Sequence, residues 1–212
     1  MHSTSEAQQI AALGRVAADA LQRRRAAGLA LVDQAEAIAR SCHNMAQRFQ
    51  QGGKLIAFGN GGSSTDAQHI AVEFVHPVMV GKRALPALAL TNDIATLTGL
   101  ANRQGWRNVF AHQLRYLAQP QDISIGLSQD KRCQNVLRGL RVAQQMGLLT
   151  IALTGGSSTA MMAHTTVDHS IVVPAEEPQI VKEIQVTIYH ILWELVHVFF
   201  EQPGLLGTRA GP

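Results

Sequence analysis

Five short, nearly continuous apolar runs separated by helical stretches constrain the fold of this chain more than any other feature. The runs are Leu55–Phe58, Leu85–Leu90, Asp122–Leu127, Leu148–Leu153 and Ser170–Val173. Strands that are apolar on both faces are typical of a parallel sheet with helices on each side, and the intervening segments are long enough for crossover helices. The pattern therefore predicts an α/β fold with a doubly wound, mostly parallel five-stranded sheet.

Helical periodicity flanks this pattern at both ends. The first 50 residues contain no proline and carry apolar residues at helical spacing, which predicts two helices with a break near Ala27-Gly28. A long final helix is expected from about Gln179 to Glu201. We expect residues 1–52 to pack on the core and on partner subunits, residues 53–201 to form the α/β unit, and residues 202–212 to form a loose tail. The whole chain is expected to be one domain.

The composition narrows the class of protein. The chain has 212 residues, of which 46% are hydrophobic and 16% charged, as is typical of a globular domain. No apolar run reaches the roughly 18 residues that span a bilayer, and the first residues lack the pattern of a signal peptide, so a cytoplasmic location is expected. A net charge of +3 argues against a dedicated nucleic-acid binder. Cys42 and Cys133 form no close metal-ligand pair.

A glycine-rich turn, Gly59-Asn60-Gly61-Gly62-Ser63-Ser64, follows the first apolar run and precedes a helix. Glycines allow close approach to the backbone, and the N–H groups at a helix start favour an anion. The turn therefore suits a phosphate or a polyol, with a plain strand-to-helix turn as the alternative. It is neither a dinucleotide fingerprint, which needs glycine where Ser64 stands, nor a P-loop, which needs Gly-Lys-Ser/Thr.

Three residues further along could carry chemistry. His69 and Glu73 are four apart, so they share one face of a helix. That pair suits a metal site or a base with an orienting histidine, although such pairs are also common surface neighbours. His190 lies in an otherwise apolar stretch, where a buried core histidine is the alternative interpretation.

Together these segments resemble the sedoheptulose-7-phosphate (phosphoheptose) isomerase family of sugar isomerase (SIS) domains. The similarity covers most of residues 50–200 and is carried by residues 59–73, 85–93, 153–156 and 190–192, by Glu183-Ile184, and by Asn102, Gly105, Val109-Phe110 and Gln113. It implies a homotetramer with active sites at subunit interfaces, a phosphorylated sugar as ligand, and aldose–ketose isomerisation through an enediol.

The resemblance also implies roles for individual residues. Glu73 and His190 would be the proton-transfer pair. The substrate-binding residues would be Asn60, Gly61, Gly62, Ser63, Asp93 and Ser128. Some relatives hold zinc near the positions of His69, Glu73, His190 and a glutamine on the final helix, so zinc is the cofactor to test.

The chain departs from the family where the ligand should lie. The loop after the third strand is Ser128-Gln129-Asp130-Lys131-Arg132-Cys133, where the family has Ser-Thr-Ser-Gly-Asn-Ser, and Pro77 and Gln179 replace an arginine and an aspartate. Lys182 stands at the position of the zinc-ligand glutamine. We hypothesise that Lys182 pairs with Glu73 and replaces the metal.

These departures leave two functions open. One is a phosphosugar isomerase. The other is a catalytically impaired regulatory or assembly factor with a protein partner, like the family's relative that binds the replication initiator protein.

Overall fold

A computed structural model describes residues 2–129, 133–156 and 167–206 of the chain. Within these ranges five parallel strands form one sheet in the order β2-β1-β3-β4-β5. The strands are β1 (Leu55–Gly59), β2 (Ala87–Ala89), β3 (Ile123–Ser128), β4 (Leu149–Gly155) and β5 (His169–Val173). The predicted α/β class with a parallel five-stranded sheet is confirmed.

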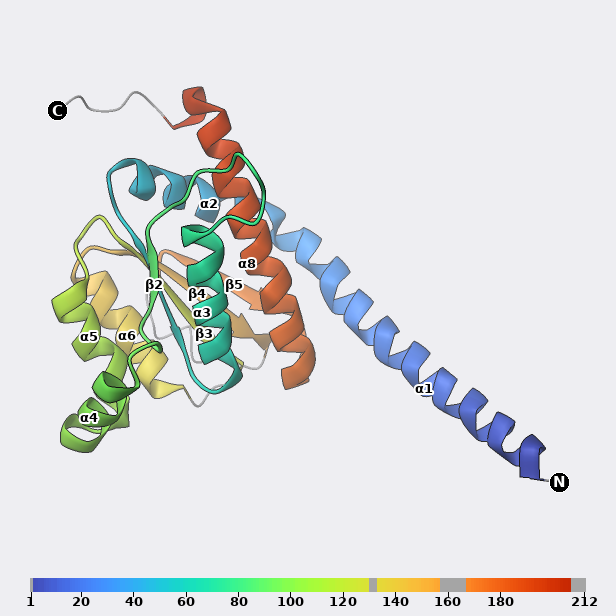
Figure 1. Ribbon diagram of the computed structural model, residues 1–212. Coiled ribbons are helices and arrows are strands. Elements are labelled where there is room, and N and C mark those ends of the chain that lie inside the picture. Colours follow the sequence, from blue (N-terminus) through green and yellow to red (C-terminus); the bar gives the residue numbers. More distant parts are fainter. Residues whose placement is uncertain (1, 130–132, 157–166, 207–212) are drawn as a thin grey trace.

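Helices cover both faces of the sheet (Figure 1). One face packs against α2 (Ala35–Gln50), α3 (Gly62–Val75) and α8 (Pro178–Glu201). The other packs against α5 (Val109–Leu117) and α6 (Gln134–Gln145), with α4 (Ile94–Gln104) and a 3-10 turn, η2 (Trp106–Asn108), leading into α5. Because both faces are covered, successive residues of β1 point into different apolar clusters, and all are buried.

Strand β2 is shorter than the expected run from Leu85 to Leu90. It lies at the edge of the sheet and is limited to Ala87–Ala89. Pro86 has no N–H to donate, so a regular ladder cannot extend through it. The Pro86 carbonyl nevertheless accepts a bond from the Leu55 N–H.

The two N-terminal helices are confirmed, but they are separated a few residues later than expected. Helix α1 runs from His2 to Leu29, and a 3-10 segment, η1 (Ala30–Gln34), joins it to α2. Gly28 is helical and lies against α8, since a Cβ at this position would be 3.7 Å from Ile184 Cδ1. Most of α1 extends away from the rest of the molecule (Figure 1).

The segment that follows α8 has regular structure in its first residues. After α8, Pro203–Leu205 form a 3-10 turn, η4, and Leu206 is buried against the same cluster as α2 and α8. The loose tail that we expected from residue 202 is therefore ordered as far as residue 206, and residues 207–212 lie outside the described ranges. None of the helices in the described part of the chain has both the length and the apolar character needed to cross a bilayer.

Candidate functional site

The glycine-rich turn lies where the sheet changes winding direction. Strand β1 has β2 on one side and β3 on the other, and ligands of such sheets bind at the carboxyl ends of strands at this point. Gly61 adopts a φ of 53°, which favours glycine. Gly59 cannot carry a side chain, since a Cβ there would lie 2.6 Å from the Ser63 Cβ.

The predicted substrate-binding residues of the turn lie together at the start of α3. Ser63 is buried and its N–H donates to the Asn60 carbonyl. The Asn60 side chain exchanges two hydrogen bonds, of 2.7 and 2.8 Å, with the side chain of Asn135 on α6. This amide pair joins the turn after β1 to the helix after β3. Asn135 was missed from the sequence, because nothing local marks a buried asparagine in the first turn of α6.

Ser128 lies at the carboxyl end of β3, the strand next to β1. It is buried at the end of β3, and its carbonyl accepts a bond from Gln185 Nε2. Of the altered loop that follows, residues 130–132 lie outside the described ranges. The expected effect of Asp130, Lys131 and Arg132 on phosphate binding therefore stays a prediction.

His69, Glu73 and His190 come together between α3 and α8. His69 Nε2 is 3.1 Å from Glu73 Oε1, which confirms that the i, i+4 pair shares one face. The rings of His69 and His190 lie 5.3 Å apart and nearly perpendicular. One ligand atom of each of the three residues lies within 4.8 Å of the others. His190 is exposed, so its interpretation as a core residue was wrong; the buried histidine of α8 is His197.

Two further residues of α8 hold this cluster. The Tyr189 hydroxyl lies 2.8 Å from His69 Nδ1, and burial together with the nearby carboxylates of Asp66 and Glu73 raises the pKa of Tyr189. Trp193 Nε1 donates to the Glu73 carbonyl at 2.9 Å. Neither residue could be selected from the sequence, because aromatic residues in an apolar helix usually indicate core packing.

Lys182 does not contact Glu73, so that hypothesis was wrong. Its Nζ lies 2.6 Å from both carboxylate oxygens of Asp66 and 3.0 Å from the Gly62 carbonyl. The reason is axial position: eight residues separate Lys182 from His190, about 12 Å along a helix. Since α3 and α8 run side by side in the same direction, Lys182 reaches the start of α3 and His190 its later turns.

The three clustered residues fit a zinc ion by their chemistry. Two imidazoles and a carboxylate with neighbouring donor atoms form a donor set typical of zinc sites that keep an open position. Lys182 stays outside this set, because its charge is paired with Asp66. Lys182 stands at the expected position of the fourth ligand, but this gives no reason to conclude that the Lys182 cation replaces a metal at Glu73.

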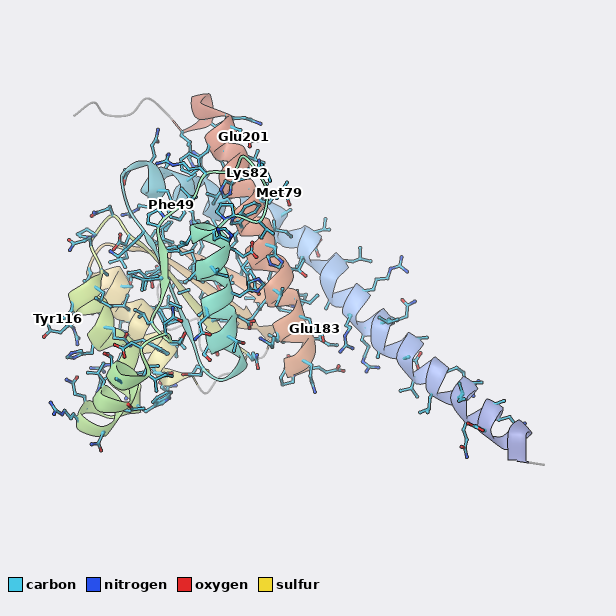
Figure 2. All side chains as sticks on the ribbon, in the orientation of Figure 1. Phe49, Met79, Lys82, Tyr116, Glu183 and Glu201 are labelled. Carbon is cyan, nitrogen blue, oxygen red and sulfur yellow. The ribbon has the colours of Figure 1, made fainter. Side chains whose placement is uncertain are left out.

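A hollow of about 400 Å³ opens beside the cluster, within the size range of small-molecule sites. It is lined by Glu73, Val78, Met79, His190, Trp193 and Glu194. Met79 lies on the segment after α3, beside the upper part of α8 (Figure 2), and an ion pair between Lys82 and Glu201 fixes that segment to α8.

Asp93 lies at a different place from the three clustered residues. It caps α4 by accepting bonds from the Thr96 hydroxyl and N–H, which lower the pKa of Asp93. It lines a separate hollow at the edge strand β2. Within one chain the structure therefore does not bring Asp93 to Glu73.

Comparisons with known proteins agree with this architecture. The family model of the SIS domain matches residues 25–155. The phosphoheptose isomerase of Aquifex aeolicus is 42% identical over 154 residues, which are 72% of this chain and 78% of that protein. The one of Solidesulfovibrio magneticus is 39% identical over 176 residues, 82% of this chain and 85% of that protein.

A solved structure of a phosphoheptose isomerase from Francisella tularensis superposes with a TM-score of 0.81 at 28% identity. The superposition covers 88% of this chain and 98% of the Francisella tularensis chain. The fold and the turn at its switch point thus define a SIS domain protein. Because phosphoheptose isomerases that are 42% and 39% identical match 72% and 82% of this chain, the chain belongs to the phosphoheptose isomerase family.

Proposed function

We propose that this chain is a phosphosugar isomerase that interconverts an aldose and a ketose phosphate, with sedoheptulose 7-phosphate as the expected substrate. The observation that carries the proposal is the cluster of His69, Glu73 and His190 beside an open hollow. Relatives that are about 40% identical are named phosphoheptose isomerases. Neither the cluster nor these relatives favour the regulatory alternative.

The proposed chemistry needs a base and an acid within reach of neighbouring carbons. Glu73 would remove the proton from the carbon next to the carbonyl, and the carbonyl oxygen would take a proton from His190, which leaves an enediol. The hydroxyl of the other carbon would then return a proton to His190, while Glu73 delivers its proton to the former carbonyl carbon. The steps balance without an oxidant or a reductant.

A zinc ion held by His69, Glu73 and His190 would polarise the carbonyl oxygen as a Lewis acid in place of the proton from His190, because a nitrogen that binds the ion has no proton to donate. Glu73 would still carry the proton, and the residues that line the hollow would still orient the sugar. We propose this metal set as the one to test, without a ligand from Lys182.

The turn is suited to the phosphate end of the same substrate. Gly62 and His69 are seven residues apart on α3, about 10 Å along the helix axis, which is comparable to the length of an extended seven-carbon sugar phosphate. The N-terminus of α3 favours an anion, whereas the charge of Lys182 beside Gly62 is already paired with Asp66.

We also propose that the chain works as a homo-oligomer, with a tetramer as the expected state, in the cytoplasm. Several apolar side chains of α1 are exposed, among them Ile10, Leu13, Val16 and Leu21. Helices with an apolar stripe are stabilised by packing rather than by propensity alone. A partner copy would supply that packing.

An isomerase assay with purified full-length protein and sedoheptulose 7-phosphate tests the function. We expect turnover, and a fall of about 10²- to 10⁴-fold in kcat for Glu73→Gln or His190→Ala. Glu36→Gln is the matched control, because Glu36 is an exposed residue of α2 whose ion pair, among the residues that the structure describes, is with Arg40 of the same helix. Absence of turnover and of thermal stabilisation with heptose, hexose and pentose phosphates would overturn the proposal.

A further inference from the structure

The imidazole of His69 is held at both nitrogens. Nε2 lies 3.1 Å from Glu73 Oε1, and Nδ1 lies 2.8 Å from the hydroxyl oxygen of Tyr189. The Tyr189 ring is only 2% exposed, and it stands edge-on to the rings of both His69 and His190, at 5.5 and 4.8 Å. A buried aromatic residue therefore contacts the partly exposed side chain of His69, which is 43% exposed.

The two hydrogen-bond partners of His69 determine which of its ring nitrogens carries a proton. An ionised carboxylate only accepts, so the bond to Glu73 requires a proton on Nε2. In the neutral ring, Nδ1 then carries a lone pair, and the Tyr189 hydroxyl must donate to it. The same hydroxyl can rotate and accept a bond from Nδ1–H whenever Nε2 binds a cation instead. A phenol at this place suits both states, whereas an apolar residue suits neither.

We propose that Tyr189 is a positioning residue of this site: its hydroxyl fixes the orientation of the His69 ring and hence the N–H that His69 presents to Glu73. Only the expected kinetic effect of Tyr189 rests on the proposed function, because the orientation of the His69 ring does not require substrate. Tyr189 acts through His69, while Glu73 and His190 remain the proposed proton-transfer pair.

Tyr189→Phe removes one oxygen and keeps the buried ring, so the packing of α8 is retained. Tyr116→Phe is the matched control, because the only other tyrosine of the chain is largely exposed on α5, away from α8 (Figure 2). Thermal unfolding of both variants close to that of the unchanged protein would establish that the fold is intact.

Nitrogen NMR of metal-free, ¹⁵N-histidine-labelled full-length protein reads the ring directly. In the unchanged protein we expect one His69 tautomer, protonated at Nε2. In Tyr189→Phe, the two nitrogen resonances should move toward the average of both tautomers, with no change in Tyr116→Phe. A His69 ring protonated only at Nδ1 in the unchanged protein, or an identical spectrum in Tyr189→Phe, would overturn the proposal.

Kinetics supply the second measurement. Partners of this kind typically contribute 10- to 100-fold to activity, so we expect kcat of Tyr189→Phe to fall about 10-fold with KM nearly unchanged. A rise in KM with kcat unchanged would contradict positioning of His69. The NMR result does not depend on turnover. If the protein isomerises no sugar phosphate, the proposed function is refuted, and the NMR spectra still decide the role of Tyr189.

Discussion

Lys182 on α8 reaches Asp66 on α3, with its Nζ 2.6 Å from both carboxylate oxygens. Asp66 is buried, being only 4% exposed, and Lys182 is about one-third exposed. The pair ties the start of α3, and with it the glycine-rich turn, to the first turns of the last helix. It therefore stabilises the place where the phosphate is proposed to bind.

Replacing Lys182 by glutamine should destabilise the protein. The change leaves a buried carboxylate without its cation, which costs 3–5 kcal/mol when both partners are buried. Because Lys182 is partly solvated, we expect a decrease of about 1–3 kcal/mol in the free energy of unfolding, measured by urea denaturation. Lys82→Gln is the control, since its partner Glu201 is mostly exposed, and it should cost less than about 1 kcal/mol. Equal effects of the two substitutions would contradict this role.

The proposed zinc set predicts which substitutions abolish metal binding. His69→Ala and His190→Ala should each lower zinc affinity at least about 10-fold, because each removes a ligand from a set of three. Lys182→Met, which introduces no zinc ligand, should leave the affinity nearly unchanged, since Lys182 pairs with Asp66. Titration of metal-free protein with zinc and a competing chelator measures this. Zinc binding that depends on Lys182 but not on His190 would refute the assignment.

The amide pair between Asn60 and Asn135 predicts an effect on ligand affinity. Asn135→Ala leaves the Asn60 amide without its partner, which should cost about 1–3 kcal/mol of stability and loosen the turn. We expect KM for sedoheptulose 7-phosphate to rise more than kcat falls. Asn108→Ala is the comparison, because its amide donates to the backbone carbonyl of Gln104, four residues earlier. If KM is the same in both variants, the amide pair does not support the ligand site.

His169 at the start of β5 predicts a loss of stability in mild acid. Burial lowers the pKa of His169 below 6.5, and Nε2 accepts a bond from the Asn44 amide, which protonation would remove. The unfolded chain therefore binds the proton more readily, so this contribution is present above pH 6.5 and is lost as the pH falls below that value.

His169→Gln keeps an acceptor for Asn44 but does not titrate, so the free energy of unfolding should fall less between pH 7 and pH 5 than in the unchanged protein. Urea denaturation at several pH values measures the difference. His76→Gln, at an exposed histidine, should keep the original pH dependence. The same slope in His169→Gln would show that other groups cause the acid sensitivity.

The order and character of the segments were determined by the sequence itself. Runs such as Leu55–Phe58 predicted the parallel strands, and the glycines of residues 59–62 predicted the position of the turn. The i, i+4 spacing of His69 and Glu73 predicted their contact. These features follow from local backbone geometry and side-chain periodicity, which act within a few residues.

Only the tertiary structure decided which distant groups meet. Lys182 pairs with Asp66 rather than Glu73, and the Tyr189 hydroxyl and the exposed ring of His190 both lie beside His69. More than a hundred residues separate α3 from α8 along the chain. Their relative rotation and axial offset are set by the packing of both helices on the sheet, and that information is in no local stretch of sequence.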